Sequence, residues 1–317
     1  MVLFGLRRVA RGLLVVLFVT FMVVALMSLA PGSPAAVILG ENATPEAVAA
    51  LESKLGLDDP VWIQWFHWIQ NAVTGDFGTS LVTNQGVLDA IVERLPVTLE
   101  LAVLAQLMAL AIAIPMAFAA ARRPGRIADR ASNFVTSILL SLPAFVAAPL
   151  FVYFFAVQAG WFPVTGWSRL ADGIGPNLQS AFLPALCVAL IEVASLQRIL
   201  RSDLITTLRE DYVVAARAKG LGGAYVMLRH AFRPSSFSLV TVAAIGFGRL
   251  LGGTIIVEAF FSLPGVGQLV ANAVNSRDLV TVQGVVAFIA IIYVLLNTLV
   301  DVGYGMLDPR VRLAGAR

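Results

Sequence analysis

Long runs of apolar residues, separated by polar stretches, divide the chain into six candidate membrane segments. A helix needs about 20 predominantly apolar residues to cross the hydrocarbon core of a bilayer. The runs lie at residues 10–30, 96–121, 132–158, 181–198, 236–258 and 282–304. The fourth run is short and ends in charged residues. The pattern predicts an all-α integral membrane protein with six transmembrane helices.

The first run has two interpretations. Basic residues precede it, at Arg7, Arg8 and Arg11, as they precede the apolar part of a secretory signal peptide. Its apolar stretch is longer than the roughly 7–15 residues of such a peptide. Pro31 also follows the small-residue exit Ser28-Leu29-Ala30 directly, which is a poor context for cleavage. We therefore expect a retained first helix.

The longest polar interruption in the C-terminal two-thirds of the chain is residues 199–235. Side chains at helical spacing predict one helix over 204–219, which Gly220 should end. A second periodic stretch over 225–232 predicts another short helix, and Pro234 should end it. The pattern is that of a folded, basic helical hairpin. It suits either an anchor for anionic lipid or a docking surface for a soluble partner. The basic residues expected nearest the membrane are Arg198, Arg201 and Arg233.

Composition agrees with a membrane protein and excludes several kinds of chemistry. Hydrophobic residues make up 59% of the 317 residues and charged residues 13%, against about 45–50% and about 25% in soluble domains. The sequence has no Gly-Lys pair, so it cannot form a P-loop that holds nucleotide phosphates. Cys187 is the one cysteine, and neither HExxH nor GxSxG occurs. We expect no catalytic residue, metal site or cofactor in this chain, and no nucleic acid partner.

The distribution of Lys and Arg predicts the orientation in the membrane. An even number of spans places both termini on one side. That side carries 17 of the 22 basic residues, in the N-terminal segment, the loop 122–130, the hairpin together with Arg198, and the C-terminal segment. Both termini and the hairpin should therefore be cytoplasmic, and residues 31–95 extracytoplasmic.

The region 31–95 should contain two helices. Thr44 is a good N-cap and Pro45 a good first helical residue, which predicts a helix over 45–55. Pro60 should begin a second helix that is rich in aromatic residues. Such a helix suits the membrane interface, and packing against the ends of the spans is an equal alternative.

A few charged residues lie within or at the ends of the predicted spans. Each costs about 2.5–3.5 kcal/mol on insertion scales, and such residues usually face a cavity or a partner. A role in a translocation path or its gating and a purely structural position are equal alternatives for each. The residues are Glu100, Glu192, Arg249, Glu258 and Asp301.

The fifth predicted span contains a cluster of glycines. Gly248 and Gly252 form a GxxxG pattern, with Gly246 and Gly253 beside it. Because glycine lets helices approach closely, this face should pack against another helix of this chain or of another subunit.

Motifs in order along nearly the whole chain resemble those of a known family. They are Gly75-Asp76-Phe77-Gly78-Thr79-Ser80, Arg94-Leu95-Pro96-Val97-Thr98-Leu99, Leu183-Pro184-Ala185-Leu186, Asp211-Tyr212, Ala215-Ala216-Arg217-Ala218-Lys219-Gly220-Leu221, Arg277-Asp278 and Leu307-Asp308-Pro309-Arg310. The chain resembles the B-type permease subunits of bacterial ABC importers of the dipeptide, oligopeptide and nickel class. Val214 stands where the general EAA loop of such permeases has a glutamate.

This resemblance implies a type I importer permease fold in the bacterial cytoplasmic (inner) membrane. It implies a second, related permease subunit, two cytoplasmic ABC ATPases that hold ATP and Mg²⁺, and an extracytoplasmic solute-binding protein. The hairpin would then be the contact with the ATPases. The implied coupling residues are Asp211, Tyr212, Ala215, Ala216, Ala218, Lys219, Gly220 and Leu221.

The resulting interpretation divides the chain into a first helix over 1–30, an outer region over 31–95 and a permease core over 96–317 that carries the coupling loop 199–235. Peptides are the favoured substrate, with nickel chelates, glutathione or another small solute as alternatives. An autonomous channel or secondary carrier that uses Glu192 and Arg249, and a scaffold that does not transport, are the other functional hypotheses.

Overall fold

The computed structural model describes residues 2–29, 33–40 and 43–307, and these residues are almost entirely helical. Outside the helices, the described residues contain one isolated antiparallel bridge, between Thr79 and Gly86. The chain forms two compact units, one made of residues 1–98 with 264–317 and the other of residues 99–263. The helix α5 (Val87–Arg122) begins in the first unit and continues through the second.

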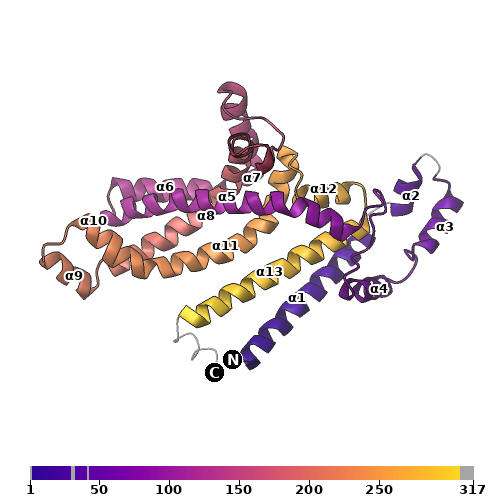
Figure 1. The fold of residues 1–317 in the computed structure, drawn as a ribbon, viewed down its shortest axis with the longest axis horizontal. Helices are drawn as coiled ribbons and strands as arrows, with labels where there is room; N and C mark the ends of the chain where they lie inside the picture. The colour runs from indigo at the N-terminus through magenta and orange to yellow at the C-terminus, as the bar shows by residue number, and fades with distance from the viewer. Residues whose placement is uncertain (1, 30–32, 41–42, 308–317) are drawn as a thin grey trace. The chain divides into compact units, whose positions relative to one another are not determined.

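The unit of residues 99–263 is a bundle built around two long helices, α8 and α11 (Figure 1). Small side chains line this core, and Ala181, Ala185 and Ala189 of α8 are completely buried, which lets the helices approach closely. Its elements after α5 are α6 (Ile127–Ser141), α7 (Ala144–Phe151), η2 (Val152–Gln158), η3 (Leu170–Asp172), α8 (Ile174–Thr207), α9 (Asp211–Ala218), α10 (Gly223–Tyr225), η4 (Val226–Ala231) and α11 (Phe232–Phe261).

In the other unit, α1 packs along α13, with α4 against α1. Gly12 makes the first contact possible, because a Cβ there would lie 2.3 Å from Cγ1 of Val294. Trp65 of α4 donates a hydrogen bond to Oγ1 of Thr20 (3.0 Å) and meets the ring of Phe21 edge to face. The elements are α1 (Val2–Ser28), α2 (Pro34–Leu39), α3 (Pro45–Lys54), α4 (Val61–Val73), α12 (Val266–Asn275) and α13 (Leu279–Leu307).

Both helices predicted for the outer region are confirmed. Thr44 caps α3 by accepting a hydrogen bond from the backbone N–H of Ala47 (3.2 Å), and Pro45 is the first helical residue. Pro60 directly precedes α4. Trp65 packs on α1, as the packing interpretation of these aromatic residues predicts, while Trp62 and Phe66 are exposed.

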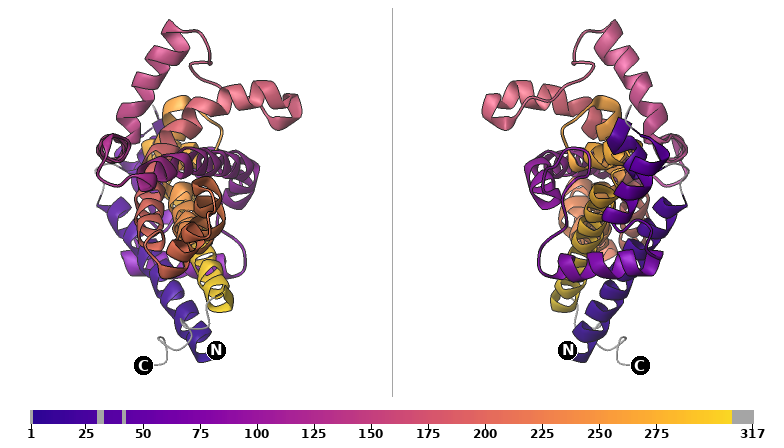
Figure 2. Two further views of the ribbon diagram at one scale, coloured as in Figure 1. Left: turned by 90° about the vertical axis from the view of Figure 1, so that its left-hand side faces the viewer. Right: turned by 90° about the vertical axis from the view of Figure 1, so that its right-hand side faces the viewer.

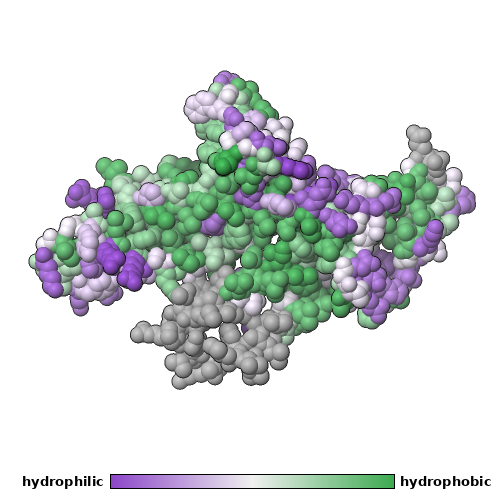
Figure 3. Space-filling model, in the orientation of Figure 1, coloured by the Kyte–Doolittle hydropathy of each residue, from purple (hydrophilic) through white to green (hydrophobic). Residues whose placement is uncertain are grey.

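Five helices are long and apolar enough to cross a membrane, and a bent helix pair raises the number to six. The five are Ala10–Ser28, Val87–Arg122, Ile174–Thr207, Gly223–Phe261 and Leu279–Leu299, and each overlaps a predicted run. In Figure 3 the surface over α6 and α11 is largely hydrophobic, while hydrophilic residues gather around α9 and α10.

The predicted third span is not one straight helix. It divides into α6 and α7–η2, which meet at an angle of 103°. Leu142 has an extended conformation (φ −99°, ψ 102°), because the ring of Pro143 disfavours the helical region for the residue before it. Figure 2 shows α7 and η2 projecting from the other helices of this unit.

Of the helix boundaries predicted for the hairpin, the end at Gly220 is confirmed, whereas the continuity of the first helix and the end of the second are wrong. The first helix does not run continuously over 204–219, because α8 ends at Thr207 and α9 begins at Asp211. The second does not stop at Pro234, because the chain is helical from Gly223 to Phe261. Pro234 lies inside this continuous helix, three residues after the end of the π-helical segment η4.

Candidate functional site

Within the hairpin of residues 199–235, a glycine in the left-handed region closes the turn between α9 and α10. Gly220 has φ +82°, which L residues with a side chain rarely adopt. Its N–H bonds to the carbonyl of Arg217 (2.9 Å), and the N–H of Leu221 bonds to the carbonyl of Ala216 (3.3 Å). These two bonds form a Schellman motif, which ends α9 and turns the chain back towards α10.

One face of α9 packs against the start of the next membrane helix. Val213 is fully buried and Ala216 is 6% exposed. They lie against η4, where Val226 and Ala231 are also buried. Because Val213 and Ala216 are three residues apart, they share a face of the helix, and this face fixes the orientation of α9.

A hydrogen bond joins α9 to the backbone of η4. Pro234 has no N–H to donate to the carbonyl of His230, four residues earlier. The hydroxyl of Tyr212 donates to that carbonyl instead (3.1 Å). Burial and the negative charge of Glu210 raise the pKa of Tyr212, so the phenol stays protonated and able to donate at neutral pH. The proline therefore leaves an acceptor that holds α9 in place.

The other faces of the hairpin are exposed and partly apolar. Tyr212, Val214 and Leu221 are exposed, with Tyr225 and Leu228 on the second arm. A cluster of exposed apolar side chains is typical of an interaction surface. Of the predicted coupling residues, Ala216 faces inwards. The exposed ones are Asp211, Tyr212, Ala215, Ala218, Lys219, Gly220 and Leu221.

At the start of the hairpin, an ion pair fixes the end of α8 to α6. Arg201 of α8 donates hydrogen bonds from Nε and from its terminal nitrogen to the two carboxylate oxygens of Asp129, the second at 2.7 Å. Asp129 is 3% exposed and also accepts from the backbone N–H of Gly125 (2.7 Å). Gln197 adds a hydrogen bond to Ser132 (2.7 Å). Arg201, one of the residues expected nearest the membrane, thus has its guanidinium engaged by the protein itself.

Deeper in the bundle, the structure brings together Glu192 of α8 and Arg249 of α11. A terminal nitrogen of Arg249 lies 3.1 Å from Oε1 of Glu192. The Glu192 side chain is 3% exposed, whereas that of Arg249 is 52% exposed. One end of the pair is therefore enclosed by protein, and the other reaches a surface of the bundle.

Gly246 makes room for this carboxylate. A Cβ at Gly246 would lie 2.3 Å from Oε2 of Glu192. Gly246 and Arg249 are three residues apart on one face of α11, so the same face supplies both the space and the cation. Of the predicted glycine seam, a Cβ added at Gly252 or Gly253 would meet no atom of a neighbouring element within 4 Å, so no contact within the described chain requires glycine at these two positions.

The other charged residues in the spans are placed as follows. Glu100 of α5 is partly buried, and its Oε1 has no hydrogen-bond partner among the described residues. Glu258 of α11 is fully buried. Asp301 belongs to α13, and its side chain lies outside the part of the chain whose side chains are described.

Sequence reasoning missed a buried carboxylate in the unit of residues 1–98 and 264–317. Asp278 is 3% exposed and accepts hydrogen bonds from the hydroxyls of Ser80 (2.5 Å) and Thr281 (2.6 Å). It also accepts from the backbone N–H of Thr281, the third residue of α13, and so caps this helix. The sequence did carry a signal for this cap, because Asp278 is followed three residues later by Thr281 at the start of an apolar run. Asp278 therefore ties the loop around Ser80 to the start of α13.

Comparison with known proteins identifies relatives over almost the whole chain. Residues 113–313 match the family described as binding-protein-dependent transport system inner membrane component, and residues 1–102 match its N-terminal region. A protein of Sinorhizobium fredii named "Probable peptide ABC transporter permease protein y4tP" is 36% identical over 97% of this chain and 98% of its own length. The dipeptide transport system permease protein DppB of Alkalihalophilus pseudofirmus is 32% identical over 98% and 100%. The glutathione transport system permease protein GsiC of Escherichia coli is 35% identical over 95% and 96%.

A first prediction concerns the turn at Gly220. Replacing Gly220 with alanine places a Cβ in the left-handed region, which costs about 1–2 kcal/mol. The amides of residues 220 and 221 should then exchange with solvent about fivefold faster or more in hydrogen–deuterium exchange. Gly222→Ala is the matched control, because Gly222 has an ordinary φ of −61° and the same open surroundings. Equal exchange in the two variants would contradict the role given to the left-handed glycine.

A second prediction concerns the pair of Glu192 and Arg249. Arg249→Gln leaves a buried carboxylate without its cation, whereas Glu192→Gln leaves a half-exposed cation. The first variant should therefore lose more stability than the second, and the double variant less than the sum of the two. The thermal unfolding of the four proteins in one detergent measures this. Equal and additive losses would show that the two side chains do not interact.

Proposed function

Because the chain belongs to the family of inner membrane components of binding-protein-dependent transport systems, and within it to the permeases of peptide ABC importers, we propose that it forms half of an ATP-driven translocation path. A second permease subunit of related fold supplies the other half. Two ABC ATPases bind at the cytoplasmic face, and a solute-binding protein delivers substrate from outside.

The observation that carries the coupling role is the construction of the hairpin. Val213, Ala216 and the hydroxyl of Tyr212 attach α9 to the beginning of a membrane helix, and the opposite faces of α9 are exposed and partly apolar. A short helix fixed in this way moves with the span that it is attached to. ATPase closure would therefore displace α11, and with it α8, between inward-open and outward-open states.

Energy for this movement comes from the partner ATPases, which hold ATP and Mg²⁺. The permease has no Gly-Lys pair from which to build a phosphate-binding loop. Its own contribution is mechanical, and we assign it no catalytic residue and no cofactor.

The topology that we propose has six spans, with α6 and α7–η2 together forming the third. Both termini and the hairpin are cytoplasmic, as the excess of basic residues on that side supports. Residues 31–95 are then extracytoplasmic, and the loop that Asp278 holds against α13 belongs to the surface on which the binding protein docks.

Glu192 and Arg249 are the best candidates in this chain for lining or gating the path. An arginine within a span faces a water-filled cavity or a partner rather than lipid. Arg249 has half of its side chain exposed and is oriented by a carboxylate that the protein buries. The exposed half is then directed into the space between the two permease subunits.

Di- and oligopeptides are the proposed substrates. Two of the relatives described above are named for peptide or dipeptide transport and share about a third of their residues with the chain along its full length. Glutathione, a peptide-like solute, is the alternative, because the glutathione permease of Escherichia coli is as similar. Uptake of labelled dipeptides and of labelled glutathione by the complete importer, with its own binding protein, separates the two.

The coupling proposal predicts the effect of a charge on the exposed face of α9. Val214 is 54% exposed, so Val214→Asp should leave the fold intact. It would place a carboxylate in an apolar docking surface, which weakens association by about 1–3 kcal/mol. Co-purification of the ATPases and peptide uptake in proteoliposomes should both fall about tenfold or more.

Val164→Asp is the matched control, because Val164 is 47% exposed in a loop outside the hairpin. It should keep the ATPases bound. Normal ATPase recovery and uptake in Val214→Asp would remove α9 from the interface. Transport by the permease in liposomes without any ATPase would instead support an autonomous carrier and contradict the proposed function.

A further inference from the structure

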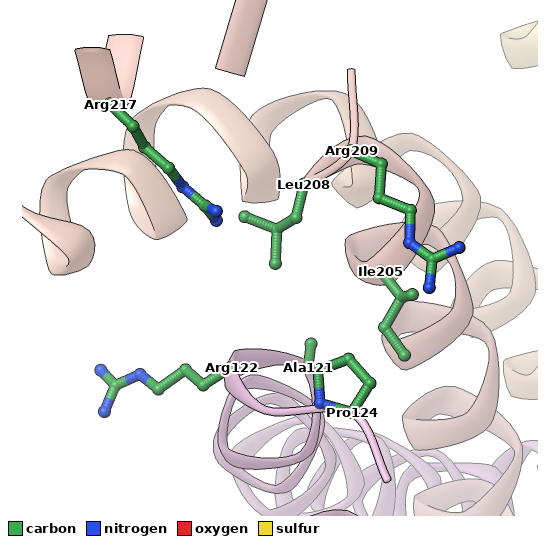
Figure 4. Close-up of a pocket in the computed structure, with 7 residues that line it drawn as sticks. All are labelled: Ala121, Arg122, Pro124, Ile205, Leu208, Arg209 and Arg217. Carbon is green, nitrogen blue, oxygen red and sulfur yellow. The ribbon is translucent and has the colours of Figure 1, made fainter. Parts of the chain in front are cut away.

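A pocket of about 370 Å³ lies between the end of α5, the end of α8 and the helix α9 (Figure 4). It belongs entirely to the unit of residues 99–263. Figure 4 shows the guanidinium of Arg217 extending from α9 into the space that separates it from the ends of the other two helices. The lining residues are Ala121, Arg122, Pro124, Ile205, Leu208, Arg209 and Arg217.

The charges that line this pocket all have one sign. Arg122, Arg209 and Arg217 come from three different helices or helix ends, and no acidic side chain lines the pocket. None of these three guanidinium groups makes a hydrogen bond or ion pair with any residue that the structure describes. The acidic Glu210 and Asp211 are close in sequence and exposed, but they do not line the pocket. An anion in this cavity would be attracted by all three cations.

Two nearby arginines, by contrast, are engaged within the chain. Arg201 is engaged by the carboxylate of Asp129, and Arg198 donates to the hydroxyl of Ser137 (3.2 Å). Arg198 and Arg201 therefore both have acceptors on α6. The three arginines around the pocket have no such acceptor among the residues that the structure describes.

The remaining lining is apolar, and its position indicates the source of the anion. Ala121, Pro124, Ile205 and Leu208 supply the hydrocarbon part of the lining. The helices α5 and α8 are both long enough to cross a bilayer, and the apolar run of α5 ends at residue 121, beside the pocket, whereas α8 continues to the pocket beyond the end of its own run at residue 198. Lipid headgroups occupy that level of the membrane. Basic pockets between spans on the cytoplasmic side are typical sites for anionic headgroups.

We propose that this pocket binds the phosphate group of an anionic phospholipid of the inner membrane leaflet. Guanidinium groups suit phosphate because their planar donors can contact two oxygens at once. The carboxyl ends of α5 and α8 carry partial negative charge and oppose an anion, so binding depends on the three arginines. A lipid held there links Arg217 of the hairpin to the ends of two spans. The position of α9 then responds to the lipid composition of the membrane.

The test uses the full chain purified with its partner subunits in detergent. Native mass spectrometry counts the lipids that the complex retains after addition of short-chain phosphatidylglycerol, phosphatidylcholine or inorganic phosphate. The variant Arg122→Gln/Arg209→Gln/Arg217→Gln removes the charge of the pocket. The control Arg123→Gln/Arg126→Gln/Arg130→Gln removes the same charge from exposed residues of the neighbouring loop and the first turn of α6 that do not line the pocket.

The expected result is selective retention of phosphatidylglycerol, which falls about tenfold or more in the pocket variant and little in the control. An equal fall in both variants would show diffuse attraction to surface charge and overturn the proposal. If millimolar inorganic phosphate abolished the retention of phosphatidylglycerol, the site would belong to a soluble anion and the proposal would be overturned. Unchanged lipid retention with loss of the ATPases in the pocket variant would show that acidic side chains of the ATPase occupy the site. Since lipid retention does not depend on transport, the proposal can fail while the importer function stands.

Discussion

The attachment of α9 to the start of α11 is the constraint on which the proposed mechanism depends. A helix of eight residues is not stable alone in water, because its few hydrogen bonds do not offset the loss of backbone freedom. It persists here because Val213 and Ala216 are buried against η4, Gly220 closes its end, and Tyr212 bonds to the carbonyl of His230. The first and the last of these contacts join α9 to the helix that continues into α11. A force applied to the exposed face of α9 therefore reaches the span instead of bending a loop.

A second constraint acts within the membrane, where a charge needs a partner. The bundle of α8 and α11 is built from small residues, and Gly246 opens the space in which Glu192 meets Arg249. The same close packing that stabilises the two helices also holds a polar group at their contact. At the ends of α5 and α8 the situation is reversed, since arginines remain without acceptors around a pocket. The pair of Glu192 and Arg249 is thus complete within the chain, whereas the three arginines of the pocket have no acceptor among the described residues.

Much of this arrangement could be predicted from the sequence, and the failures have local causes. Apolar runs located the spans because their length is set by the bilayer, and Thr44 with Pro45 located α3 because capping is a local interaction. The bend at Leu142 was missed because several spans contain proline, and the sequence does not show which proline breaks the helix. Helix continuation through Pro234 was missed because it requires the π-helical segment η4. The roles of Gly246 and Asp278 depend on residues more than 50 positions away in the chain, namely Glu192 and Ser80, and no local pattern reveals such contacts.

The most direct test of the central claim is the amount of peptide transported per ATP hydrolysed by Tyr212→Phe in proteoliposomes. The variant removes one hydroxyl, which holds α9 to η4, and leaves the aromatic ring in place. Tyr225→Phe is the control, because this exposed hydroxyl of the same hairpin bonds to no residue that the structure describes. Rigid attachment predicts that Tyr212→Phe keeps its ATPases and hydrolyses ATP, but transports less peptide per ATP than the control. An unchanged ratio of transport to hydrolysis would contradict the account.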